Sequence, residues 1–252
     1  MSGIVHVAGR KLPVLSLAFP RRVTAIRQIE ITSRCQLRCS YCPSPQIMKG
    51  EMPGRPALDM TRATFERALA WVSEFVRAGT QPELNLAGIG ESTLHPEFAD
   101  FVRLARGAAG PNLRLILATN GLIANEELAE LFACERVEVW VSLHRPERAA
   151  LAVEIYRRAK VLGGVSSDPS LNANDWGGQV KWHNSPDNAL PCLWLRDGHV
   201  MVLADGRTTA CCLDATGAGV IGHVDNLNVS PTKPFTLCKT CHHVIGVEGY
   251  EQ

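Results

Sequence analysis

Three cysteines in one short segment could act together in metal chemistry. Cys35, Cys39 and Cys42 are separated by three and then by two residues. A structural zinc site needs a closed set of four ligands, whereas a cubane iron–sulfur cluster held by three cysteines keeps one iron open to another ligand. The spacing therefore indicates an open cluster site. A zinc site with a distant fourth ligand is the alternative.

Five further cysteines gather in the last quarter of the chain. Two are adjacent and two form a C-x2-C pair; they are Cys192, Cys211, Cys212, Cys238 and Cys241. Four thiolates make a closed set that suits either a zinc ion or a second cubane cluster. Because neighbouring side chains of a strand point to opposite faces, we expect only one of the adjacent pair to be a ligand.

The composition is that of an ordinary globular protein, with 46% hydrophobic and 20% charged residues. The formal net charge of +1 provides no field that would attract nucleic acid or an anionic membrane. The apolar run at residues 12–19 lacks a secretory cleavage site, and a membrane span needs about 20 residues. We therefore expect a cytoplasmic protein without nucleic-acid or membrane partners. Disulfides are not expected there, and the ninth cysteine, Cys134, is predicted to be a buried core residue.

Strand and helix patterns alternate through the first two thirds of the chain. The predicted strands cover residues 23–32, 84–87, 113–118 and 137–143, and the predicted helices cover residues 61–78, 96–106, 124–134 and 147–162. This alternation predicts an α/β fold with a parallel sheet built from right-handed crossover units. Later in the chain, residues 199–203 and 208–212 read as a hairpin.

Composition shifts predict four parts of the chain. We expect an N-terminal extension at residues 1–22, a β/α part at residues 23–165, a connecting segment at residues 166–190 and a small hairpin-containing domain at residues 191–252. The connecting segment is rich in Gly, Asn, Asp, Ser and Pro and has no helical period.

Polar and glycine residues follow each predicted strand of the β/α part. The carboxyl ends of parallel strands meet at one edge of the sheet, which is where such folds place their chemistry. Apart from the first cysteine group, the candidates are Gly88, Gly90 and Glu91 after the second strand, Thr119 and Asn120 after the third, and Ser142 and His144 at the end of the fourth.

In this order, the cysteines and strand-end residues resemble those of the radical S-adenosylmethionine (SAM) superfamily, over about residues 23–162. The resemblance implies a partial (β/α) barrel of about five to six parallel strands, with a 4Fe–4S cluster on Cys35, Cys39 and Cys42. It further implies that SAM binds the open iron and is cleaved to a 5'-deoxyadenosyl radical that takes a hydrogen atom from the substrate.

The same resemblance implies individual contacts to SAM. Tyr41 matches the aromatic residue beside the adenine, the Gly-x-Gly-Glu element would receive the amino group, and the polar residues of the next two strand ends would contact the carboxylate and ribose. The cofactor-binding residues expected on this basis are Tyr41, Gly88, Gly90, Glu91, Thr119, Asn120 and Ser142.

The last quarter resembles the auxiliary-cluster domain, of SPASM or twitch type, that some radical SAM enzymes carry. The matching ligands are Cys192, Cys211, Cys238 and Cys241. Asp214 and the Gly-x-Val turn at residues 222–224 also fit. This implies a second 4Fe–4S cluster, with Cys211 preferred over Cys212.

The resemblance extends to small radical SAM dehydrogenases of antibiotic biosynthesis that oxidise a hydroxyl-bearing carbon of an aminocyclitol. We therefore expect a small polar substrate, oxidised with the auxiliary cluster as electron acceptor. His144 and the segment Asn174, Asp175 and Trp176 are the candidate substrate residues. A flavodoxin or ferredoxin is the implied reductant.

Two other functions remain open from the sequence. The main alternative is a maturase that modifies a ribosomal peptide, although only about 22 residues precede the first predicted strand, too few for a peptide-recognition domain. The remote alternative is an electron carrier or zinc-bound interaction module, which would not need an open cluster site beside Glu91 and Asn120.

Overall fold

The protein forms an open α/β sheet in a computed structural model that describes residues 4–7, 10–13, 22–165, 192–227, 235–239 and 241. Eight strands lie in the order β10-β9-β8-β3-β4-β5-β6-β7. The strands from β8 to β7 in this order run parallel, β9 pairs antiparallel with β8, and β10 pairs antiparallel with β9. The prediction of a partial barrel with five to six parallel strands is confirmed.

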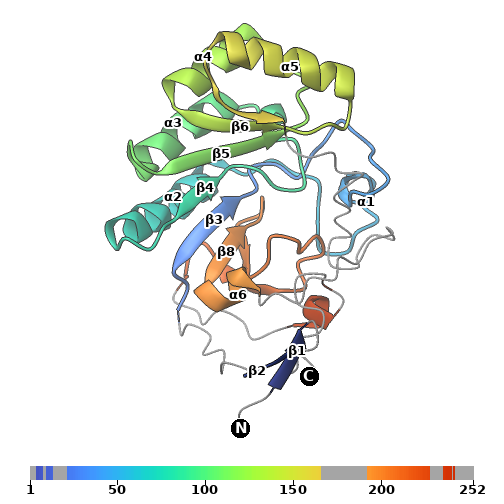
Figure 1. The fold of residues 1–252 in the computed structure, drawn as a ribbon, viewed down its shortest axis with the longest axis vertical. Helices are drawn as coiled ribbons and strands as arrows, with labels where there is room; N and C mark the ends of the chain where they lie inside the picture. Colours follow the sequence, from blue (N-terminus) through green and yellow to red (C-terminus); the bar gives the residue numbers. More distant parts are fainter. Residues whose placement is uncertain are drawn as a thin grey trace.

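Alternating strands and helices build the first part of the sheet, and they follow the predicted order (Figure 1). The elements are β3 (Ala25–Ile29), α1 (Ser44–Met48), α2 (Arg62–Arg77), β4 (Glu83–Asn85), the 3-10 helix η1 (Ser92–Leu94), α3 (Phe98–Ala109), β5 (Arg114–Thr119), α4 (Glu126–Cys134), β6 (Val137–Val141), α5 (Pro146–Arg158) and β7 (Leu162–Val165). The sequence did not predict α1, η1 or β7.

The predicted hairpin is present, but it belongs to the same sheet as the barrel strands. It consists of β8 (His199–Val202) and β9 (Arg207–Thr209), preceded by α6 (Leu193–Asp197) and followed by β10 (Val220–His223). Strand β8 runs parallel to β3, with Ala25 opposite His199 and Ile29 opposite Val202. Figure 1 shows β8 directly beside β3. The last quarter of the chain therefore adds strands to the barrel sheet.

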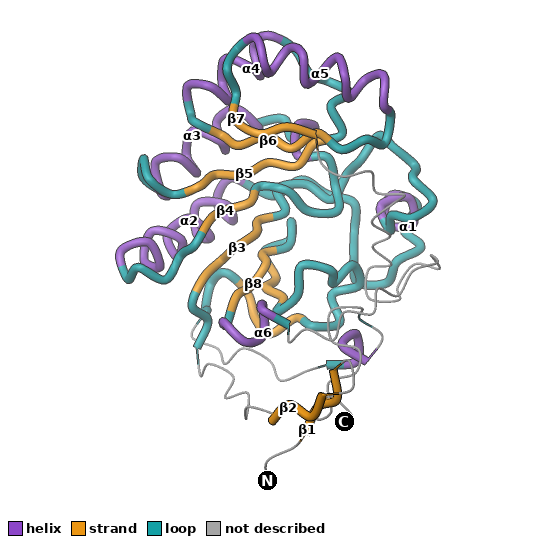
Figure 2. The backbone as a smooth tube through the Cα atoms, viewed as in Figure 1, coloured by secondary structure: helices purple, strands orange, loops and turns teal. Residues whose placement is uncertain are grey.

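Helices α2 to α5 lie along one side of the sheet (Figure 2), and the main core fills the space between them and the strands. Helix α2 buries Phe65, Leu69 and Val72, the spacing that predicted it, and the Thr61 hydroxyl accepts the N-cap bond from Thr64. The rings of Phe65 and Phe101 stack 4.1 Å apart, which joins α2 to α3.

Two predictions about the outer elements are wrong. Cys134, expected in the core, is exposed at the last position of α4, because the helix turns that position away from the sheet. The helix expected to reach residue 162 ends at Arg158, since Lys160 takes a left-handed φ of 59° and the chain then enters β7. A short two-stranded sheet, β1 (Ile4–Val7) with β2 (Arg10–Pro13), also precedes the first predicted strand.

A row of alternating charges crosses four neighbouring strands near their amino ends. Arg27 of β3 pairs with Glu83 of β4, which also bonds Arg114 of β5 at 3.0 Å; Arg114 then pairs with Glu138 of β6 at 2.9 Å. This end of a parallel barrel contributes stability, and the opposite end carries the chemistry.

Within the described residues, no helix is both long enough and apolar enough to span a membrane.

Candidate active site

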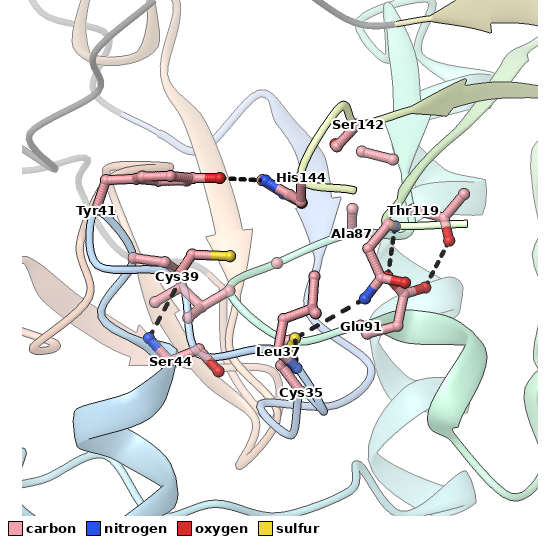
Figure 3. A pocket seen from close by; sticks show the side chains of 16 residues that line it. Cys35, Leu37, Cys39, Tyr41, Ser44, Ala87, Glu91, Thr119, Ser142 and His144 are labelled. Atoms are coloured by element: carbon pink, nitrogen blue, oxygen red, sulfur yellow. Dashed lines mark hydrogen bonds between the residues drawn. The ribbon is translucent and has the colours of Figure 1, made fainter. Parts of the chain in front are cut away.

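A cavity of about 200 Å³ lies at the carboxyl ends of the parallel strands (Figure 3). It brings together every site residue that the sequence predicted in the barrel part. These are Cys35, Cys39, Tyr41, Cys42, Gly88, Gly90, Glu91, Thr119, Asn120, Ser142 and His144. The candidate substrate residues Asn174, Asp175 and Trp176 lie outside the described residues.

The first cysteine group lies on a loop between β3 and α1 whose backbone amides point at its thiols. The amide of Leu37 donates to Cys35 Sγ at 3.4 Å, and the amide of Ser44 donates to Cys42 Sγ at 3.5 Å. Such bonds favour thiolates and tune the potential of iron–sulfur clusters. The donor set and its orientation fit a cluster held by three cysteines.

Burial favours the protonated form of two of these thiols, Cys35 and Cys42. It raises the pKa of Cys35 and raises the pKa of Cys42 to about 12. Since only thiolates are metal ligands, loading the site must displace protons from it.

The two glycines after β4 are required by close packing against the end of β3. A Cβ atom on Gly88 would lie 2.4 Å from Cγ of Glu30, and one on Gly90 would lie 2.2 Å from the carbonyl oxygen of Thr32. Both distances are far inside van der Waals contact. The resemblance assigned this Gly-x-Gly-Glu element to the amino group of SAM, but packing within the chain already demands the two glycines.

Glu91 joins two neighbouring strand ends beneath the cavity. Its carboxylate is 3% exposed and accepts hydrogen bonds from the Thr119 hydroxyl at 2.7 Å, the Asn120 amide at 2.7 Å and the Thr93 hydroxyl at 2.7 Å. Burial raises the pKa of this carboxyl, and the hydrogen bonds oppose that shift. Much of its accepting capacity thus serves the chain itself, and these bonds hold the loop after β4 to the end of β5.

The next two strand ends place polar groups toward the cysteine loop. The side-chain amide of Asn120 donates to Gln36 Oε1 at 3.3 Å and lies 4.0 Å from Cys35 Sγ. The Ser142 amide donates to the Thr119 carbonyl at 2.8 Å, which holds the two strand ends together.

Tyr41 and His144 meet on the other side of the cavity. The Tyr41 hydroxyl lies 2.6 Å from His144 Nδ1, and the two rings stack with centroids 5.7 Å apart (Figure 3). The contact joins the cysteine loop to the loop after β6. The sequence placed both residues near the cavity but did not predict their contact.

A buried ion pair that sequence reasoning missed supports the site from below. Glu30, directly after β3, bonds Arg55 at 2.7 Å and also accepts from the amides of Ile89 at 3.0 Å and Ala204 at 3.4 Å. It thus joins the Gly-x-Gly-Glu loop to the hairpin of the last quarter. The sequence does contain a signal for this ion pair, because Glu30 is a carboxylate between two apolar residues of a buried strand.

The second cysteine group forms its own packed cluster beside the hairpin, containing Cys192, Cys211, Cys212, Cys238 and Cys241. Burial, and then the Cys211 thiol, raise the pKa of Cys192, and the same influences raise the pKa of Cys238 to about 11. The Cys211 thiol therefore acts electrostatically on two of the other thiols of this cluster. A hydrogen bond with Cys212, together with burial, raises the pKa of Cys211 itself.

Asp214 orders the loop that carries Cys211 and Cys212. Its buried carboxylate accepts from the Thr209 hydroxyl at 2.7 Å and from the amides of Ala218 at 2.9 Å and Gly219 at 2.8 Å.

Among the described residues, no three His, Cys, Asp or Glu side chains are close enough to share a single metal ion.

Comparison with known families assigns the barrel part of the chain. The profile described as the radical SAM superfamily matches residues 29–172, which is more than half of the sequence. The chain belongs to the radical SAM superfamily. Membership implies a 4Fe–4S cluster and SAM, and the three-cysteine loop of this radical SAM chain is the donor set that fits them.

Curated relatives are similar to this radical SAM protein over part of their length. It is 27% identical to a GTP 3',8-cyclase of Rhizobium etli over 176 residues, which cover 66% of this chain and 48% of the relative. It is 38% identical over 147 residues to the tungsten-containing aldehyde ferredoxin oxidoreductase cofactor-modifying protein of Pyrococcus furiosus, covering 56% of this chain and 35% of the relative. The chain thus spans half or less of these relatives.

Solved structures share the fold of this radical SAM protein. The structure of BtrN in complex with AdoMet and 2-DOIA superposes with a TM-score of 0.61 at 20% identity, covering 81% of this chain and 78% of BtrN. Native anSMEcpe with bound AdoMet superposes with a TM-score of 0.57 at 14% identity, covering 90% and 84%. At these identities the likeness describes the architecture alone.

Proposed function

We propose that this radical SAM enzyme dehydrogenates a hydroxyl-bearing carbon of a small polar molecule. The observation that carries the proposal is the pairing of two cysteine groups on one sheet: three cysteines line the cavity, and five pack beside the hairpin whose strand β8 adjoins β3. When bound there, a 4Fe–4S cluster with SAM supplies a radical that takes a hydrogen atom, and a second cluster supplies an electron acceptor.

In this proposal each cavity residue has a definite task. Cys35, Cys39 and Cys42 hold the first cluster, and the amides of Leu37 and Ser44 orient two of their sulfurs. Tyr41, Gly88, Gly90, Glu91, Thr119, Asn120 and Ser142 form the walls against which SAM lies, and Glu91 also fixes Thr119 and Asn120 at the end of β5.

The substrate in this proposal loses one hydrogen atom from carbon, one proton from the hydroxyl and one electron, and becomes a ketone. His144 lines the same cavity and is the candidate polar contact to the hydroxyl. Asn174, Asp175 and Trp176 are proposed to contact the substrate as well.

The second cysteine group suits an acceptor for that electron. Cys192, Cys211, Cys238 and Cys241 would be its ligands, and Asp214 would hold the loop that presents Cys211. The Glu30 contacts to Ile89 and Ala204 would keep the two cysteine groups in a constant relationship.

Anaerobic reconstitution tests the two-cluster part of the proposal. We expect about eight irons per chain, from two cubane clusters. Replacing Cys35, Cys39 and Cys42 together by Ala should leave about four irons and abolish the formation of 5'-deoxyadenosine. One zinc with four irons would contradict the acceptor role.

Substrate labelling tests the reaction. Aminocyclitols and related polyols carrying deuterium at the carbinol carbon are incubated with the enzyme, SAM and a reductant. We expect deuterium in 5'-deoxyadenosine, with one deoxyadenosine per ketone. Deuterium retained in every polyol, combined with deoxyadenosine formation on a ribosomal peptide substrate, would replace the proposal with the peptide maturase.

A further inference from the structure

Ser44 carries a buried hydroxyl that the site described so far does not use. The residue is 1% exposed and lines the cavity, and its Oγ has no hydrogen bond to a nitrogen or oxygen atom of the described residues. A buried hydroxyl without a partner loses the hydrogen bonds it makes in water, so native proteins leave few such groups. A buried hydroxyl that lines a cavity and has no nitrogen or oxygen partner indicates that its partner is a sulfur atom or a ligand of that cavity.

The position of Ser44 narrows the identity of that partner. Its backbone amide already donates to Cys42 Sγ at 3.5 Å. Burial raises the pKa of Cys35, and a hydrogen bond with the Ser44 hydroxyl opposes that shift. Figure 3 shows Ser44 on the same side of the cavity as Cys35 and Cys39. The hydroxyl therefore faces the space bounded by sulfur atoms.

Local structure does not explain the hydroxyl. Ser44 is the first residue of α1, whose N-cap position is occupied by Pro43 and has no side-chain capping bond. Alanine would fit this helix position equally well, and the backbone amide that serves Cys42 would remain.

We propose that the Ser44 hydroxyl donates a hydrogen bond to a sulfur atom of the cluster held by Cys35, Cys39 and Cys42. This inference rests on the proposed cluster site. Reduction adds negative charge to the cluster sulfurs, so a donor stabilises the reduced form more than the oxidised form. Ser44 is thus a positioning residue that makes the cluster easier to reduce.

The test is a redox titration of the reconstituted enzyme. The titration is monitored by the EPR signal that changes when SAM is added. That signal separates the first cluster from any second one. In Ser44→Ala we expect about a tenfold lower ratio of reduced to oxidised cluster at a fixed potential, a shift of about 59 mV to more negative values for a one-electron couple. Ser40→Ala is the matched control, because Ser40 is an exposed serine of the same loop; its potential should equal that of the wild type.

Each outcome decides the question. Wild-type protein that binds no iron at the first site contradicts the proposed function itself. A cluster with unchanged potential in Ser44→Ala overturns only the role of Ser44. If Ser44→Ala loses its cluster, Ser44→Thr, which keeps a hydroxyl, should retain four irons and the wild-type potential. Loss of the cluster in both variants also overturns the role, because a hydroxyl that tunes the potential is not required for assembly.

Discussion

The hydroxyl of Tyr41 lies 2.6 Å from Nδ1 of His144, and this bond ties the cysteine loop to the loop after β6 across the candidate active site. The loops are separated by 103 positions in the chain. Each loop is therefore held at the cavity partly by the other. A substitution of either residue should therefore alter the position of both loops.

The strength of this tie can be measured by a double-mutant cycle. Tyr41→Phe removes the hydroxyl and keeps the ring, so we expect the free energy of unfolding of the iron-free protein to fall by about 0.5–1.5 kcal/mol in urea. In a His144→Phe background the same change should cost close to nothing. Equal effects in both backgrounds would show that the two side chains are not coupled.

Substitution of Gly90 tests the packing explanation for the Gly-x-Gly-Glu loop. In Gly90→Ala the new Cβ meets the Thr32 carbonyl oxygen at 2.2 Å, so we expect a loss of about 1–3 kcal/mol or more in unfolding free energy. Gly107→Ala in α3 is the control, since its Cβ has open space, and should stabilise the helix by about 0.5–1 kcal/mol. Similar melting temperatures for both variants would contradict the assignment.

Glu91→Ala distinguishes support of the strand ends from direct ligand binding. The substitution leaves the Thr119 hydroxyl and the Asn120 amide buried without their acceptor, so the iron-free protein should lose about 1–3 kcal/mol of unfolding free energy. Glu97→Ala removes a half-exposed carboxylate and should change stability by less than about 0.5 kcal/mol. Unchanged stability with weakened SAM binding would assign the Glu91 carboxylate to the ligand instead.

Iron counting decides between the adjacent cysteines. Besides burial, the Cys211 thiol raises the pKa of both Cys192 and Cys238. Cys211→Ala should therefore lower the iron content from about eight to about four per chain. Cys212→Ala should retain about eight. The reverse pattern would mean that the loop presents the other cysteine to the cluster.

His199 should make the fold sensitive to mild acid. Burial, and then the nearby Arg27, lower the pKa of this imidazole below its ordinary value of 6.5, while Asp197 opposes the shift. Below pH 6.5 the unfolded chain takes up a proton that the folded chain refuses, so stability present above pH 6.5 is lost as pH falls toward the folded pKa. The slope can reach about 1.4 kcal/mol per pH unit.

The matching variant is His199→Phe, which keeps a ring against Trp194, where the two rings now meet edge to face. Urea unfolding from pH 7 to pH 5 should show a flatter decline for the variant than for the wild type. Parallel curves would show that His199 does not contribute to the acid sensitivity.

Much of this protein is determined by local sequence. The apolar spacing that includes Phe65, Leu69 and Val72 determined α2, because a helix buries one face every 3.6 residues. The order of the strands placed Glu91, Asn120 and Ser142 at one edge, because parallel strands joined by right-handed crossovers share an edge. The candidate site followed from these two regularities and the cysteine spacing.

Only the tertiary structure decided how distant segments meet. No local pattern indicates that β8 pairs with β3, since that choice depends on contacts across more than 160 residues. The same holds for the Glu30 contacts to Ile89 and Ala204, and for the closeness of Gly90 to Thr32. The side chain of Cys134 is exposed for a related reason: its helix presents one face to the core, and which face that is depends on the sheet beneath it. Local periodicity is determined by backbone geometry, whereas these contacts depend on how completed elements pack.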